Sequence, residues 1–272
     1  MIKKMICYSD VDGTIYGPDF KVSVETKKDI LRFQKEGGEF VISTGNPAFD
    51  RHQNLASELN VRYLITSNGG AIFDNQEKKY IYTNPFSLKT QELIISMAKK
   101  FNSQLNYWTD KDYYTFNPKL EFKYSYAYSL FSDTNVKIND KTDKNVVKME
   151  LFDSEENIAK IYEEIKNEKI NIVFMKKNHL EITAHNSSKG NAAKWFSENI
   201  YNEDIKNSMT IGDSPNDWSM LVISDFSYAM ENSRDNTREK AKFYTSTYNQ
   251  NGVGLALRDY VDRVKSKNNS GN

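Results

Sequence analysis

The sequence predicts an α/β protein in which a Rossmann-like parallel sheet, the core, is interrupted by an inserted α+β domain. Short apolar strands alternate with amphipathic helices in the first third of the chain, and this alternation resumes after Lys189. Such an order builds a parallel sheet flanked by helices. Between about Asn84 and Ala184 the sequence pattern changes and predicts several aromatic strands with few helices. The 272 residues are enough for two domains.

The first part of the core is expected over residues 1–84. Residues 2–8 form a buried strand, and Ser23 caps a helix that stops at Gly37. The pattern then predicts a strand at 39–43, a helix at 47–59, a strand at 62–66 and a hairpin of strands 71–73 and 80–82.

The inserted domain is expected over residues 85–184, and the core should resume over 185–265. Inside the insertion we expect a helix from Ser87, strands at 106–108, 113–116, 122–131 and 146–152, and a helix at 154–167. The resumed core is predicted to hold helices at 189–201, from 216 and at 253–264, with strands at 208–211 and 226–230. Residues 266–272 are polar and are expected to be disordered.

Charge and composition exclude several partner classes. Lys plus Arg and Asp plus Glu both number 37, so no overall field attracts nucleic acid or an anionic membrane. The N-terminal apolar run is too short for a signal peptide, and no stretch reaches membrane-span length. A lone Cys7 gives no sign of an oxidising compartment. We therefore expect a cytoplasmic protein that acts on a small molecule. A monomer or weak homodimer is expected, although no sequence feature decides the oligomeric state.

Two carboxylates follow the first predicted strand in the segment Ser9-Asp10-Val11-Asp12-Gly13-Thr14. Their position places them at the carboxyl edge of the sheet, where open α/β folds bind ligands. Adjacent anions repel unless a cation or a proton separates them, so the pair predicts a hard metal or a raised pKa. Gly13 and Thr14 should allow a tight turn with exposed N–H groups. An ordinary Asp-Gly turn is the alternative interpretation.

Four motifs in order resemble those of the haloacid dehalogenase superfamily. Asp10 to Thr14 is similar to its first motif, and Ser43-Thr44-Gly45 follows the second predicted strand. Ser188-Lys189-Gly190 opens a helix, and the segment Gly212-Asp213-Ser214-Pro215-Asn216-Asp217 follows a later strand. With an insertion of roughly 100 residues between the second and third motifs, the chain resembles the Cof-type subfamily IIB, whose inserted lid is the C2B cap.

That resemblance implies a phosphatase. Asp10 would be the nucleophile that forms an aspartyl phosphate, and Asp12 the general acid and base. ATPase pumps of the superfamily carry Thr in place of the second carboxylate, so Asp12 implies protonation of a poor alcohol leaving group and favours ester hydrolysis.

The cofactor implied is Mg²⁺. Asp10, the backbone carbonyl of Asp12, and Asp213 would bind the ion, and Asp217 would support this shell. The residues implied to surround the phosphoryl oxygens are Val11, Gly13, Thr44, Gly45, Lys189 and Asn216. Taken singly, Thr44-Gly45 could be a strand-ending turn, Lys189 a solvated lysine, and Asn216 a helix cap.

Substrate identity stays open at two features. Asn46 follows Gly45 where the family often has arginine, and Arg51, about a turn further on, is either its partial substitute or a surface residue. No arginine lies between Asn84 and His185, which argues against a phosphohexomutase with a second phosphate site.

Further alternatives concern aromatic and histidine side chains. Tyr124, Tyr126 and Tyr128 share a strand face that either packs under helices or stacks on a sugar ring. The three histidines, His52, His179 and His185, show no zinc-ligand spacing and are taken as structural. Small phosphorylated metabolites, above all sugar phosphates, are the expected substrates. A regulator that binds such a metabolite without turnover is the alternative outside enzymes.

Overall fold

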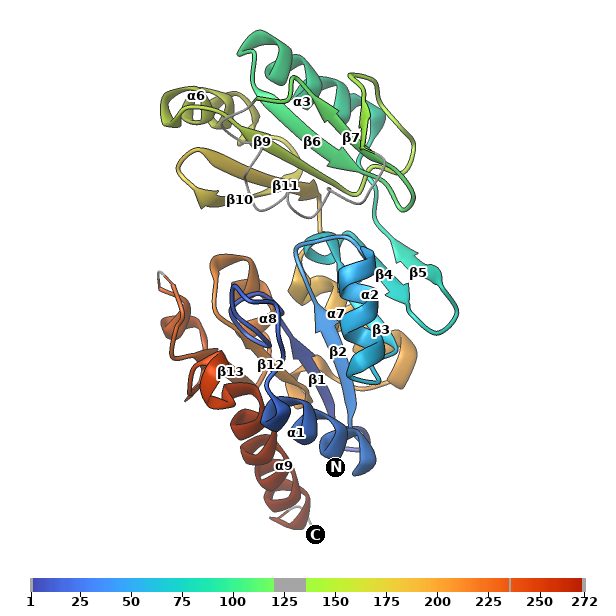
Figure 1. Cartoon of the computed structure of the whole chain (residues 1–272), viewed down its shortest axis with the longest axis vertical. Coiled ribbons are helices and arrows are strands. Elements are labelled where there is room, and N and C mark those ends of the chain that lie inside the picture. The colour runs from blue at the N-terminus through green and yellow to red at the C-terminus, as the bar shows by residue number, and fades with distance from the viewer. Residues whose placement is uncertain (1, 120–135, 235, 271–272) are drawn as a thin grey trace. The chain divides into compact units, whose positions relative to one another are not determined.

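The structure is a computed structural model and describes residues 2–119, 136–234 and 236–270 (Figure 1). It separates into two compact units, residues 1–81 with 188–272, and residues 82–187. These limits lie within a few residues of those expected at 84/85 and 184/185. The expected strand at 122–131 and its three tyrosines lie outside the described residues.

The first unit is built on an eight-stranded sheet in the order β14-β13-β12-β1-β2-β3-β4-β5. Its strands are β1 (Ile6–Ser9), β2 (Glu39–Ser43), β3 (Tyr63–Thr66), β4 (Ala71–Asp74), β5 (Lys79–Thr83), β12 (Met209–Gly212), β13 (Phe226–Met230) and β14 (Phe243–Thr245). Neighbouring strands from β14 to β3 run parallel, and β4 is antiparallel to β3. The predicted α/β fold with a parallel core sheet is confirmed.

Among the described residues of this unit, five α-helices pack beside the sheet. They are α1 (Val24–Lys35), α2 (Asp50–Glu58), α7 (Lys189–Tyr201), α8 (Trp218–Leu221) and α9 (Gly252–Ser270). Ser23 caps α1 as expected, because its side chain accepts the N–H of Thr26 at 3.1 Å. α1 and α9 pack against each other, and Arg258 of α9 reaches Asp29 of α1 at 2.6 Å. The core between sheet and helices is formed by apolar side chains such as Phe40, Ile211 and Leu257.

The helix expected from Asn216 is present but short: the 3₁₀ turn Pro215–Asp217 leads directly into the four residues of α8. One expectation for this unit is wrong. The tail expected to be disordered continues α9 to Ser270. Asn268 explains the longer helix: its side chain accepts the N–H of Ile2 at 2.9 Å and donates to the carbonyl of Ile2 at 3.2 Å.

The second unit is an α+β domain with a six-stranded sheet in the order β10-β11-β9-β6-β7-β8. Its strands are β6 (Gln104–Trp108), β7 (Tyr113–Phe116), β8 (Val136–Ile138), β9 (Lys148–Phe152), β10 (Ile170–Lys176) and β11 (His179–Ala184). Helices α3 (Leu88–Lys100) and α6 (Glu155–Ile165) supply Ile94 and Ile158 to a core with Leu105 and Leu151. Strands alternate their side chains, so the other face carries polar residues such as Asn106 and Glu150.

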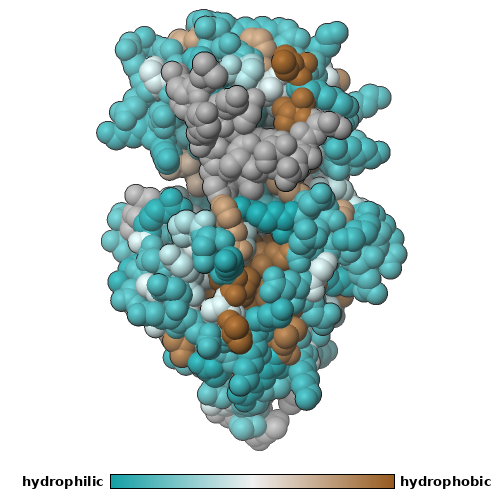
Figure 2. Space-filling view, viewed as in Figure 1, coloured by the Kyte–Doolittle hydropathy of each residue, from teal (hydrophilic) through white to brown (hydrophobic). Residues whose placement is uncertain are grey.

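The exposed surface is mostly polar. The face shown in Figure 2 is predominantly hydrophilic, in keeping with a mean hydropathy of −0.71. Within the described residues, no helix combines the length and apolarity needed to cross a membrane.

Candidate active site

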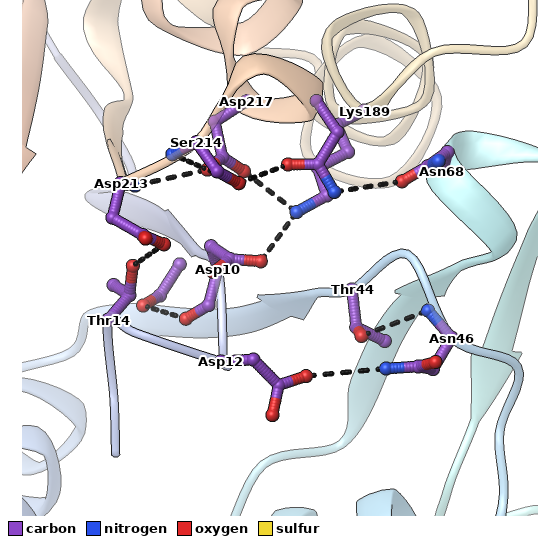
Figure 3. A network of polar contacts seen from close by, with 12 residues as sticks. Asp10, Asp12, Thr14, Thr44, Asn46, Asn68, Lys189, Asp213, Ser214 and Asp217 are labelled. Atoms are coloured by element: carbon purple, nitrogen blue, oxygen red, sulfur yellow. Dashed lines mark hydrogen bonds and ion pairs between the residues drawn. The ribbon is translucent and has the colours of Figure 1, made fainter. Parts of the chain in front are cut away.

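Three loops meet at the carboxyl edge of the first unit's sheet. Asp10 directly follows β1, Thr44 directly follows β2, and Asp213 directly follows β12. Because β12, β1 and β2 are adjacent and parallel, their carboxyl ends lie side by side (Figure 3). This edge is the ligand-binding edge of open parallel sheets. The structure therefore brings together side chains that are far apart in the sequence.

Lys189 joins two of the carboxylates. Its ammonium lies 2.5 Å from Oδ1 of Asp10 and 2.7 Å from Oδ1 of Asp217 (Figure 3). The lysine is the first residue of α7, which Ser188 caps by accepting the N–H of Asn191. Burial by itself would lower the pKa of Lys189, but the charges of Asp10 and Asp217 outweigh it and raise that pKa. Lys189 is thus held as a buried cation.

An acidic cluster remains after this pairing. Asp10, Asp213 and Asp217 are buried, and each offers a carboxylate oxygen within 4.8 Å of the others. Burial first, and then the negative charges of the neighbouring aspartates, raise the pKa of Asp213 and of Asp217. Two cations face these three carboxylates, the buried Lys189 and the exposed Arg234, whose Nε lies 3.7 Å from Oδ2 of Asp213, so one negative charge remains unbalanced. A donor set of oxygens with excess negative charge fits a hard divalent cation.

Asp217 is also fixed by the backbone. Its Oδ2 accepts the N–H of Asp213 at 3.1 Å and that of Ser214 at 3.0 Å. Gly212 leaves the space that this carboxylate occupies, because a Cβ there would lie 2.4 Å from Oδ2 of Asp217. The loop after β12 is consequently organised around the Asp217 side chain.

Asp12 has different surroundings from Asp10. Its side chain is 30% exposed, and its two oxygens meet different donors. The amide of Asn46 lies 3.3 Å from Oδ2, and Nη2 of Arg51 lies 3.5 Å from Oδ1. Asp12 is therefore the carboxylate of this loop that reaches solvent, while Asp10 is enclosed.

A group of amides borders the loop after β2. Oγ1 of Thr44 accepts the N–H of Asn46 at 3.1 Å, and the side-chain amide of Asn216 donates to Oδ1 of Asn68 at 3.2 Å (Figure 3). A Cβ on Gly45 would lie 2.9 Å from that same Oδ1 of Asn68. Glycine at position 45 thus lets Asn68 approach the loop.

A family model described as haloacid dehalogenase-like hydrolase matches residues 7–257. This chain belongs to that family. The matched span contains Asp10, Asp12, Lys189 and Asp213. Hydrolases of this family generally use a divalent metal, and the acidic cluster could bind one.

Named relatives include phosphatases. A candidate phosphatase of Buchnera aphidicola is 32% identical over 250 residues, covering 84% of this chain and 86% of the relative. A 5-amino-6-(5-phospho-D-ribitylamino)uracil phosphatase of Bacillus subtilis, YcsE, is 27% identical over 259 residues, covering 93% and 94%. The haloacid dehalogenase-like chain described here is accordingly a phosphatase.

Solved structures share the fold over nearly the whole chain. The subclass IIB sugar phosphatase BT4131 has a TM-score of 0.83 at 18% identity, covering 94% of this chain and 99% of its own. A haloacid dehalogenase-like hydrolase from B. subtilis has a TM-score of 0.81 at 22% identity, covering 93% and 98%. At these identities the likeness describes the architecture of this hydrolase.

One expectation about the first loop of this hydrolase is wrong. The N–H of Gly13 donates to the carbonyl of Tyr16 at 2.8 Å, and that of Thr14 donates to the carbonyl of Val11 at 3.2 Å. These groups close the turn and are not exposed donors. Gly13 has another reason to be glycine: its φ is +93°, and a Cβ would lie 2.6 Å from Oδ2 of Asp213.

The run from Ser67 to Gly70 resembles a landmark of the Cof-type subfamily, but the sequence gives Asn68 no individual role. Asn68 lies in the short turn Ser67–Gly69 after β3, and Ser67 and Asn68 both have positive φ, +55° and +51°. Strained backbone of this kind tends to persist at functional sites. The Ser-Asn-Gly-Gly run directly after a strand was the signal that could have assigned Asn68 to the site.

A second group of acids lies in the other unit. The side chains of this group lie close enough together to hold a metal ion, with ligand atoms within 4.8 Å of one another: Glu150, His179 and Glu181. However, the buried ammonium of Lys148 lies 2.9 Å from Glu150 and 2.7 Å from Glu181. Two carboxylates share one buried lysine here, whereas the cluster around Asp213 joins three carboxylates at the carboxyl edge of the parallel sheet.

Proposed function

We propose that this phosphatase is Mg²⁺-dependent and hydrolyses small phosphorylated metabolites, sugar phosphates above all, through an aspartyl phosphate on Asp10. The observation that carries the proposal is the enclosed Asp10 carboxylate, 2.5 Å from the Lys189 ammonium and beside Asp213. A cation on each side would offset the charge that gathers when a phosphate approaches a carboxylate.

Mg²⁺ would be held by Asp10, Asp213 and the backbone carbonyl of Asp12. Once bound, it would neutralise phosphate charge and align the ester. Asp217 supports this arrangement from outside by fixing the loop that carries Asp213. Three carboxylates exceed the two cations beside them, Lys189 and the exposed Arg234, and this excess is what favours a divalent ion at this position.

The first step breaks the ester bond. An oxygen of Asp10 attacks phosphorus while the P–O bond to the alcohol breaks, and Asp12 donates its proton to the departing oxygen. Asp12 suits this role because its carboxyl group reaches solvent two residues from the nucleophile. The free alcohol leaves, and the phosphoryl group stays on Asp10.

The second step restores the enzyme. Asp12, now a carboxylate, takes a proton from water as that water attacks phosphorus, and the bond to Asp10 breaks to release inorganic phosphate. We assign the phosphoryl oxygens to Lys189, the hydroxyl of Thr44, the amide of Asn216, and the N–H groups of Val11 and Gly45. We propose no N–H donation from Gly13, because that group is used within its turn.

The sugar phosphate class has its support in the relatives. BT4131 is named a sugar phosphatase, and YcsE is named for a substrate with a phosphorylated ribityl chain. Both names describe a phosphate on a polyhydroxylated carbon chain.

The test is release of phosphate from p-nitrophenyl phosphate and from a panel of sugar phosphates, with and without Mg²⁺. Asp10→Asn should abolish turnover, whereas Asp262→Asn, an exposed control on α9, should leave it unchanged. Turnover by Asp10→Asn would refute the nucleophile. Binding without hydrolysis would favour a regulator, and isomerisation without net phosphate release would favour a mutase.

A further inference from the structure

We propose that Arg51 is a positioning residue that, with Asn46, holds the Asp12 carboxyl group in the orientation needed for proton transfer. The inference rests on the proposed function, in which Asp12 is the acid and base. This chain has the amide side chain of Asn46 directly after Gly45, and the inference concerns how such a chain orients the Asp12 carboxyl group.

The two oxygens of Asp12 are engaged from two directions. Oδ2 faces the Asn46 amide at 3.3 Å, and Oδ1 faces Nη2 of Arg51 at 3.5 Å. A carboxyl group with a donor at each oxygen cannot rotate freely about its terminal bond. Both contacts are longer than the ideal distance, so they orient Asp12 without locking it.

Arg51 is itself held on several sides. Its Nη2 lies 3.3 Å from Nε2 of His52. A guanidinium only donates, so that ring nitrogen must accept. Burial lowers the pKa of His52 to about 3, which keeps the ring neutral and able to accept. The guanidinium also lies 4.4 Å from the ring centre of Phe20.

The side chain of Arg51 is therefore aimed by the start of α2 and by the Tyr16–Phe20 loop. Tyr16 contributes a second ring, 5.9 Å from the guanidinium. The Arg51 side chain is 24% exposed and that of Asp12 is 30% exposed, so the pair remains at the surface of the site. Arg51 acts on the substrate through Asp12, which makes its effect depend on how much the leaving group needs a proton.

The experiment compares two esters of nearly the same shape, phenyl phosphate and p-nitrophenyl phosphate. Phenolate is the poorer leaving group and depends more on a general acid. Because a general acid contributes about 100- to 10,000-fold, Arg51→Met should lower kcat/KM for phenyl phosphate about 10- to 100-fold. For p-nitrophenyl phosphate the loss should be about threefold or less.

Three further variants sharpen the comparison. Arg32→Met, the same change at an exposed arginine of α1, should leave kcat/KM unchanged for both esters. Asp12→Asn should also lower kcat/KM more for phenyl phosphate than for p-nitrophenyl phosphate, and its loss should exceed that of Arg51→Met. Adding Arg51→Met to Asp12→Asn should lower kcat/KM no further. Asn46→Arg should restore phenyl phosphate hydrolysis to Arg51→Met, which separates positioning from failure to fold.

Equal losses on both esters in Arg51→Met would overturn the inference, as would additive losses in the double variant. Failure of the proposed function has a different signature, which is turnover by Asp10→Asn. The two results are therefore distinguishable.

Discussion

The ammonium of Lys189 lies 2.5 Å from Oδ1 of Asp10, although 179 positions separate the two residues in the sequence. The side chains of both are buried, and Asp217 completes the contact from the other side at 2.7 Å. Removing the cation would leave two carboxylates buried beside each other, which is more costly than the loss of one contact.

Lys189→Met should therefore reduce both stability and activity. Stranding buried charges costs about 3–5 kcal/mol in the free energy of unfolding, and losing a donor to the phosphoryl group costs about 100- to 1000-fold in kcat. Urea unfolding in EDTA and steady-state assays with Mg²⁺ measure the two effects. Lys194→Met, at an exposed position of the same helix, is the control. A Lys189→Met protein as stable as the parent would contradict the buried-charge argument.

Metal removal should destabilise the protein as well as stop turnover. Three buried carboxylates repel one another, and a bound divalent ion would relieve that repulsion. At 100 times its dissociation constant, Mg²⁺ should add about 2.7 kcal/mol. Differential scanning fluorimetry with Mg²⁺ and with EDTA measures the shift in Tm. Asp213→Asn should lose the shift and Asp262→Asn should keep it; a shift retained by Asp213→Asn would place the ion elsewhere.

Two glycines with similar φ angles allow the effect of a strained backbone to be distinguished from the effect of a displaced catalytic group. Gly13 and Gly37 have φ of +93° and +88°, but only at Gly13 would a Cβ meet Asp213, at 2.6 Å, whereas nothing lies within 4 Å at Gly37. Alanine at either position should cost about 1–3 kcal/mol of stability for the strained φ. Gly13→Ala should also lower kcat about tenfold or more, since misplacing a catalytic group by ~1 Å can cost about 100-fold. Equal kcat in the two variants would contradict this.

The clustering of much of the candidate site could be predicted because its residues follow strands directly. Asp10, Thr44 and Asp213 are positioned by the ends of β1, β2 and β12, so the alternation of strands and helices was enough to bring them together. The motif resemblance then supplied Lys189, whose contact with Asp10 no local pattern contains.

The remaining features depend on contacts that the sequence does not express. The engagement of the Gly13 N–H by Tyr16 is a property of one turn's geometry. Helix α9 continues past Lys265 because Asn268 pairs with the backbone of Ile2, at the other end of the chain. The contact between Arg51 and Asp12 depends on how close the start of α2 lies to the loop after β1. The sequence does not give that distance.

The pH dependence of stability should carry a contribution from His52. Its ring is fully buried, and burial followed by the nearby charge of Arg51 lowers its pKa to about 3 from an ordinary 6.5. In the folded protein the ring thus stays neutral down to about pH 3, while the unfolded chain takes up a proton below about pH 6.5. Stability should be fully present above that pH and fall as the solution is acidified, at about 1.4 kcal/mol per pH unit for this one proton.

His52→Gln tests this directly, because the side-chain oxygen of glutamine can still accept from Arg51 but does not titrate. Between pH 7 and pH 5 the parent should lose about 2 kcal/mol more unfolding free energy than this variant. Urea unfolding followed by circular dichroism at a series of pH values gives the difference. His185→Gln, a change at an exposed histidine, should follow the parent. If His52→Gln and the parent lose stability in parallel on acidification, the buried neutral ring is not what links stability to pH.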